Sequence, residues 1–165
     1  MNLYLGFLFL GACGGSFEPV TTTTGSATDG GETTASSTGV VENPCDLVAP
    51  ETVASVFGAT SASGEPGIAR NCTFTMAGGV APSVEVFDYG AASDWDGIRA
   101  GFEDNRGGTT DIPGLGDEAF QPNDVGPYEL VVRAGEIVFS VAVQVGSGGH
   151  EVEAALVELA GAIAG

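Results

Sequence analysis

The chain has 165 residues, of which 22 are Asp or Glu and 4 are Lys or Arg, and its formal net charge is -18. Nucleic-acid affinity depends on clustered Lys and Arg side chains at the phosphates, so this composition argues against DNA or RNA as a partner. Hydrophobic residues make up 43% of the chain, which is enough for a packed core in one domain with additional segments.

The first residues predict a signal peptide. Residues 3–12 are almost wholly apolar. This run is shorter than the roughly 20 residues that cross a bilayer, but it has the length of a signal-peptide apolar region. It ends in Leu10-Gly11-Ala12-Cys13, which resembles the lipobox of bacterial lipoproteins. We therefore expect cleavage after residues 1–12 and a lipid on Cys13, which anchors the chain to the membrane on its extracytoplasmic side.

Two alternatives to this lipoprotein signal stay open: an ordinary secretory signal, and a buried strand. Signal peptides begin with basic residues, and here only Met1 and Asn2 precede the apolar run. Either the free amino terminus supplies the positive charge, or the true start of translation lies upstream of Met1.

Residues 13–42 are predicted to be a flexible tether that follows the lipidated cysteine. They consist mainly of Gly, Ser, Thr and Ala, and such a segment buries too little surface to offset its ordering entropy. The mean reach of a flexible chain of this length is about 30 Å, which holds residues 43–165, a single predicted domain, away from the membrane.

The domain opens with a predicted helix over residues 50–57. Pro50 suits the first turn of a helix and Gly58 suits its end. Residues 60–67 are rich in turn formers and are expected to be a loop. Alternating apolar residues then predict strands over residues 68–77 and 83–89, which form a hairpin.

A second helix is predicted from Ser93, which would cap it together with Asp96. Trp95 lies on its apolar stripe and is expected to anchor the core rather than to serve as a ligand platform. Gly97 and Gly101 weaken this helix by up to about 1 kcal/mol each, or they allow it to approach the sheet closely.

The loop Gly114-Leu115-Gly116-Asp117-Glu118 comes next and is the candidate structural loop of the domain. A short strand over residues 118–121 and strong strands over 128–134 and 136–145 are expected after it. The last of these strands is mostly apolar, which predicts a central strand covered on both faces. A final helix is predicted over residues 149–164 from its apolar spacing.

The element order predicts an α+β fold. It reads as helix–strand–strand twice, followed by a C-terminal helix, and short connections pair strands antiparallel. We expect one antiparallel sheet of four to five strands with helices packed on a face. If Cys13 carries lipid, Cys45 and Cys72 remain as a pair, and a disulfide between them would stabilise the fold by about 3.5 kcal/mol.

Three short motifs carry a family resemblance: Cys45-Asp46-Leu47-Val48-x-Pro50-Glu51-x-Val53, Cys72-Thr73-Phe74, and Gly114-Leu115-Gly116-Asp117-Glu118-Ala119. Together they resemble a family of actinobacterial cell-envelope lipoproteins that has a domain of unknown function. The resemblance implies an exported, lipid-anchored, disulfide-bearing domain without established enzymatic activity. It carries over no catalytic residues.

Motifs for catalysis or metal binding are weak in this sequence. His150 is the only histidine and is expected to lie exposed at a helix start rather than act as a general base. Asp117 and Glu118, with Asp111 and Asp124, are acids that a calcium ion could use, but their spacing is not that of an EF-hand. A structural loop is therefore favoured, and no metal or cofactor is expected.

These observations favour a non-enzymatic binding or sensor module. We expect a monomer that reaches its membrane through the lipid on Cys13 and binds an envelope protein or a small molecule. A cell-envelope hydrolase that uses surface carboxylates is the alternative, and a structural spacer is a third. Two carboxylates about 5–10 Å apart across a pocket would favour the hydrolase, whereas an apolar groove would favour the binding module.

Overall fold

The computed structural model describes residues 41–124, 128–143 and 150–165. The predicted signal peptide, Cys13 and the tether up to residue 40 lie outside the described residues. All strands and helices reported below belong to the predicted domain.

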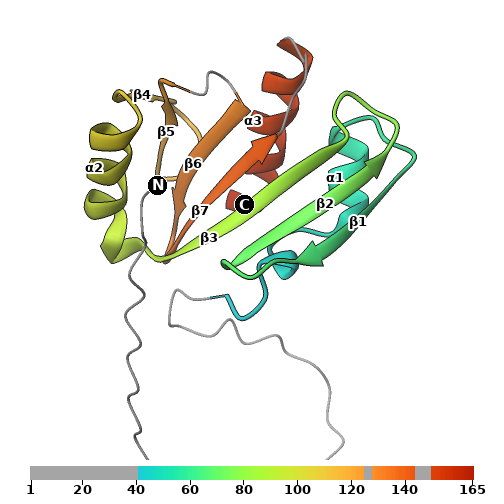
Figure 1. The fold of residues 1–165 in the computed structure, drawn as a ribbon, viewed down its shortest axis with the longest axis horizontal. Helices are drawn as coiled ribbons and strands as arrows, with labels where there is room; N and C mark the ends of the chain where they lie inside the picture. Colours follow the sequence, from blue (N-terminus) through green and yellow to red (C-terminus); the bar gives the residue numbers. More distant parts are fainter. Residues whose placement is uncertain (1–40, 125–127, 144–149) are drawn as a thin grey trace, which may run out of the picture. The chain divides into compact units, whose positions relative to one another are not determined.

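The described chain forms one antiparallel sheet of seven strands in the order β1-β2-β3-β7-β6-β5-β4 (Figure 1). The expected number of four to five strands is therefore wrong. The strands are β1 (Ser61–Pro66), β2 (Asn71–Ala77), β3 (Ser83–Ala91), β4 (Thr109–Asp111), β5 (Glu118–Pro122), β6 (Glu129–Ala134) and β7 (Ile137–Val143).

The two strands that the prediction lacked are the edge strands β1 and β4. β1 occupies the segment predicted as a loop, and its sequence SASGEP has no apolar alternation because its side chains stay largely exposed. It is nevertheless paired with β2 along its whole length. β4 has three residues, which is too short for a periodic pattern.

Three α-helices accompany the sheet: α1 (Pro50–Val56), α2 (Trp95–Asn105) and α3 (His150–Ala164). The predicted first and last helices are confirmed within the described residues. The predicted cap of α2 is wrong, because a short 3-10 helix, η2 (Ala92–Asp94), takes up Ser93 and leads into α2 without a side-chain cap.

Helices α1 and α3 cover one face of the sheet, here called the inner face. Val53 and Phe57, in and directly after α1, and Leu156 and Leu159 of α3 are fully buried there against side chains of four strands: Phe74, Val86, Leu130, Phe139 and Val141. Full burial of such side chains is worth about 1.5–3 kcal/mol each before entropy is subtracted. This cluster is the main core of the domain.

Helix α2 packs on the opposite, outer face, so the helices cover two faces rather than one. Trp95 lies in a second buried cluster with Phe120, Val131 and Val138, and its ring centroid is 5.2 Å from that of Phe120. This confirms Trp95 as a core residue. β7 lies between β3 and β6 and is buried on both sides, as predicted for a central strand.

A bulge interrupts the pairing of β3 with β7 between Asp88 and Gly90. Asp88 is only 4% exposed. Its carboxylate accepts the backbone N–H of Gly90 at 2.8 Å and forms an ion pair with Arg70. Arg70 stands in the β1–β2 turn with φ of 56°, and its carbonyl accepts the N–H of Asp88. The pair therefore fastens the β1–β2 turn to the bulge, and no periodic pattern in the sequence predicts it.

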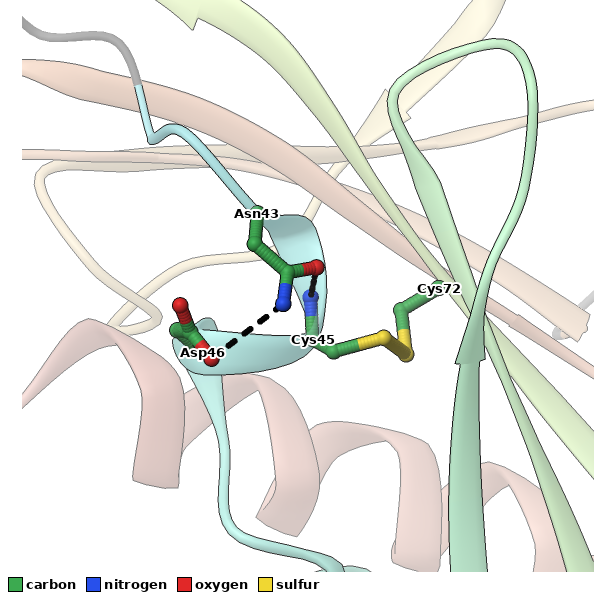
Figure 2. The surroundings of a disulfide bond; sticks show 4 residues. All are labelled: Asn43, Cys45, Asp46 and Cys72. Carbon is green, nitrogen blue, oxygen red and sulfur yellow. Dashed lines mark hydrogen bonds between the residues drawn. A yellow bond between two sulfur atoms is a disulfide. The ribbon is translucent and has the colours of Figure 1, made fainter.

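The predicted disulfide between Cys45 and Cys72 is confirmed. The two Cα atoms are 5.0 Å apart, which is normal for this bond. Figure 2 shows that it joins the 3-10 helix η1 (Pro44–Leu47) to β2, and that Asn43 caps η1 by accepting the N–H of Cys45 at 3.1 Å. The bond therefore holds η1 against β2, the second strand from one edge of the sheet.

Replacing Cys45 and Cys72 together with Ala is expected to lower the free energy of unfolding by about 3.5 kcal/mol, because the closed loop of 27 residues no longer restricts the unfolded chain. Urea unfolding in a Cys13→Ala background, followed by Trp95 fluorescence, measures the change. A loss below about 1 kcal/mol would contradict this prediction.

Candidate functional site

The candidate loop is fastened to the β6–β7 hairpin. Leu115 is buried in the main core. The N–H of Asp117 donates to the carbonyl of Arg133 at 2.9 Å, and its carboxylate accepts the N–H of Gly135 at 2.8 Å. Gly116 has φ of 59°, and a Cβ there would come within 2.5 Å of the Arg133 carbonyl oxygen. The conformation of this loop therefore allows it to pack against the main core and the β6–β7 hairpin.

Each of the acids considered for calcium has a hydrogen-bond or ion-pair partner of its own. Asp111 pairs with Arg99 at 2.7 Å, and Asp124 pairs with Arg106 at 2.8 Å. Glu118 accepts the indole N–H of Trp95 at 2.8 Å and pairs with Arg133. Among residues 41–124, 128–143 and 150–165, no group of three or more His, Cys, Asp or Glu side chains is arranged to hold a metal ion.

Three of these four acids, Asp111, Asp117 and Glu118, line a small hollow of about 210 Å³ beside the candidate loop. Its lining is Arg99, Asp111, Ile112, Pro113, Gly114, Leu115, Asp117, Glu118 and Ala119. Each of its three carboxylates is already held by a guanidinium, an indole N–H or a backbone N–H. A glycosidase needs one carboxyl to donate a proton and another to attack or to activate water, and here each carboxylate already has a hydrogen-bond or ion-pair partner.

A second hollow, of about 340 Å³, lies along α2 on the outer face. Its lining is mostly apolar and consists of Tyr89, Gly97, Ile98, Gly101, Phe102, Asn105 and Arg106. Gly97 and Gly101 are one helical turn apart, and a Cβ at either position would meet no atom within 4 Å. The glycines therefore open a space on the helix surface and do not bring α2 closer to the sheet. We call this feature the α2 hollow.

Aromatic side chains form the floor of the α2 hollow. The Tyr89 ring lies edge-on to that of Phe102, with centroids 5.9 Å apart. On its other side it stacks on Phe87, at 6.1 Å between centroids. Tyr89 is the residue between Asp88 and Gly90 at the bulge of β3, so the irregular pairing sets where this ring stands.

Charged groups gather at one end of the α2 hollow. Arg106 donates from Nε to both carboxylate oxygens of Asp124, at 2.8 and 2.9 Å, and from Nη2 to Glu129 at 3.1 Å. The side chain of Glu129 is only 15% exposed. Burial raises the pKa of Glu129 above its ordinary value, and the nearby Arg106 opposes this rise.

Two hydroxyl groups lie next to this charged end. Burial, and then the charge of Glu129, raise the pKa of the Tyr89 hydroxyl. Ser140 of β7 is fully buried near that hydroxyl, but no hydrogen bond of normal geometry reaches its oxygen within the described part of the chain. Buried hydroxyls usually have a hydrogen-bond partner. The Ser140 hydroxyl, which lies beside the hollow, therefore has hydrogen-bonding capacity that is not used.

Sequence reasoning missed this site because its residues are distant in the chain. Tyr89 comes from β3, Ser140 from β7, Glu129 from β6 and Arg106 from the end of α2. The signals that point to it in the sequence are a serine inside an apolar run and two glycines in a helix. His150, by contrast, stands exposed at the start of α3, as predicted, with its ring nitrogen 3.6 Å from Glu153.

Comparison with known proteins found no matching family model, no matching curated protein and no matching solved structure. Within the described residues, none of the helices combines the length and the apolar character needed to span a bilayer.

Gly116→Ala is expected to cost about 3 kcal/mol of folding free energy, because a side chain there adds left-handed strain to a clash with the Arg133 carbonyl. Gly114→Ala is the matched control, since it also has positive φ but open space around its Cβ, and about 1 kcal/mol is expected. Urea unfolding of the two variants measures both. Equal losses would contradict the clash.

Glu129→Gln is expected to change how stability depends on pH. Because the folded-state pKa of Glu129 is raised, its protonated form favours folding, and the native chain loses this contribution as the pH rises from about 4.5 through the folded pKa. The native chain should therefore lose stability relative to Glu129→Gln over this rise. Unfolding from pH 4 to 7 measures it, with the exposed Glu65→Gln as the control for lost charge. A constant difference between the native chain and Glu129→Gln would contradict the prediction.

Proposed function

We propose that this chain is an exported envelope lipoprotein, anchored by a lipid on Cys13, that acts as a non-enzymatic binding module. The α2 hollow is the observation that supports binding. Ligand sites are concave, mostly apolar and edged by a few polar groups, and this hollow combines apolar walls with Tyr89, Arg106 and Glu129 at one end.

The groups around the α2 hollow also suit binding better than catalysis. Arg106 is held by Asp124 and Glu129, so it has little freedom to stabilise a developing negative charge. Among the residues that the structure describes, no histidine, cysteine or serine that would attack a substrate lines the hollow. These features favour the binding module over the hydrolase that uses surface carboxylates.

The lipid anchor rests on the N-terminal sequence and on its likeness to a lipobox. Attachment by lipid also suits the acidity of the chain, because a net charge of -18 is repelled by anionic headgroups and needs a covalent or hydrophobic hold. The resemblance to actinobacterial envelope lipoproteins points the same way.

Metabolic labelling with radioactive palmitate tests the anchor. The native chain is expected to take up label and to fractionate with membranes, whereas Cys13→Ala is expected to take up none. Cys45→Ala is the control, since it removes a thiol that is engaged in the disulfide. Equal labelling of the Cys13→Ala chain would overturn the lipid anchor and leave the binding proposal untouched.

Gly101→Leu tests the binding proposal. The added side chain enters the open space of the α2 hollow, and leucine favours a helix more than glycine does, so the fold should be kept. Two chains that both carry Cys13→Ala are compared, one otherwise native and one with Gly101→Leu. Each is incubated with envelope extract, and the small molecules that it retains are identified by mass spectrometry. A molecule held by the native chain and lost in Gly101→Leu is expected. Identical profiles would contradict the proposal.

A further inference from the structure

Building on the proposed binding function, we infer that the α2 hollow takes an organic cation with an apolar body, such as an amine attached to a small ring or chain. The inference rests on three properties of the hollow: the shape and apolarity of its walls, the excess of carboxylates around it, and the hydroxyl groups at its charged end.

The walls fit the apolar body of such a ligand. A hollow of about 340 Å³ lies at the small end of the range for small-molecule sites. Ile98 and Phe102 line it from α2, and Tyr89 lines it from the sheet. The faces of aromatic rings are negative, and Arg106 already lies over the Phe102 ring at 5.9 Å from its centroid, so the Tyr89 ring is the wall that attracts a ligand cation.

The charged end of the α2 hollow, where Arg106 lies, carries a net negative charge. Arg106 is the single cation at this end within the described part of the chain, and both Asp124 and Glu129 are bound to it. Glu85 adds a third carboxylate on the same face of the sheet, because Ala142 of β7 is the register partner of both Glu85 and Glu129. That register places the two glutamates about 10 Å apart.

The exposed side of α2 adds a further carboxylate. Asp104 follows Gly101 by three residues within α2, so helical spacing puts this exposed side chain near one end of the α2 hollow. No Lys is present anywhere in the chain. An anionic ligand such as a fatty acid or a phosphate would be repelled, and a cation would be attracted.

The buried hydroxyl groups provide hydrogen bonding for such a cation. The Tyr89 hydroxyl can donate to the unpartnered oxygen of Ser140 while its own oxygen accepts an N–H from a ligand. An ammonium or guanidinium group has only donors to offer, and the carboxylates and hydroxyls at this end can all accept.

Three probes of similar shape and different charge test the inference: 2-phenylethylamine, 2-phenylethanol and phenylacetate. Binding to the full chain with Cys13→Ala is followed by NMR titration at low salt. The amine is expected to bind about five- to tenfold more tightly than phenylacetate, with the alcohol between them. The preference is expected to shrink in Glu129→Gln and at high salt.

Gly101→Leu is expected to abolish amine binding. Ala100→Leu is the matched control, since Ala100 is exposed on α2 and does not line the hollow, and it should bind like the native chain. Retained amine binding in Gly101→Leu, or equal loss in both variants, would overturn the assigned site.

The remaining outcomes separate this inference from the binding function on which it rests. Equal affinity for the three probes, or tighter binding of phenylacetate, overturns the preference for a cation but leaves a binding hollow. Absence of binding by every probe also overturns the inference, and the mass-spectrometric comparison of the native chain with Gly101→Leu then decides whether the hollow binds another molecule.

Discussion

The pairing of β3 with β7 is the contact on which the rest of the domain depends. Every other pair of neighbouring strands is also consecutive in the chain, so β1–β2–β3 and β4–β5–β6–β7 are two separate meanders (Figure 1). The ladder from Val84–Val143 to Ala91–Ile137 joins them. Because of this pairing, both meanders contribute to one inner face. The main core is buried between that face and helices α1 and α3. The local hairpins can form early, but the core requires this long-range closure.

The same pairing also locates the candidate site. Its ladder is regular up to Asp88 and shifts at the bulge, where Gly90 adopts φ of 109° that a residue with a Cβ rarely takes. Before the shift, Asp88 points to the inner face and holds Arg70. At the shift, Tyr89 turns toward α2 and closes the floor of the α2 hollow. One irregularity in the sheet thus positions both a structural ion pair and the floor of the α2 hollow, and redirecting side chains is a common use of bulges.

Sequence periodicity predicted the elements that bury a face of their own. Cys72, Phe74 and Met76 alternate into the core, and α3 shows its apolar spacing clearly. Periodicity did not predict β1, because the small polar residues of this strand are held extended by their pairing with β2 rather than by their own preference for strand conformation. The disulfide followed from counting cysteines. The α2 hollow did not follow from any pattern, because tertiary pairing alone brings Tyr89 and Ser140 together, and because glycines in a helix have several uses.

The disulfide has a mechanical consequence. A pull on the chain ahead of Cys45 passes through the covalent bond to Cys72 and enters β2 directly, so α1 and β1 lie outside the path of the force. β2 is flanked on both sides, by β1 and β3, so the load meets two ladders of backbone hydrogen bonds at once. Such a bypass would let α1 and β1 stay folded when force is applied to the chain ahead of Cys45.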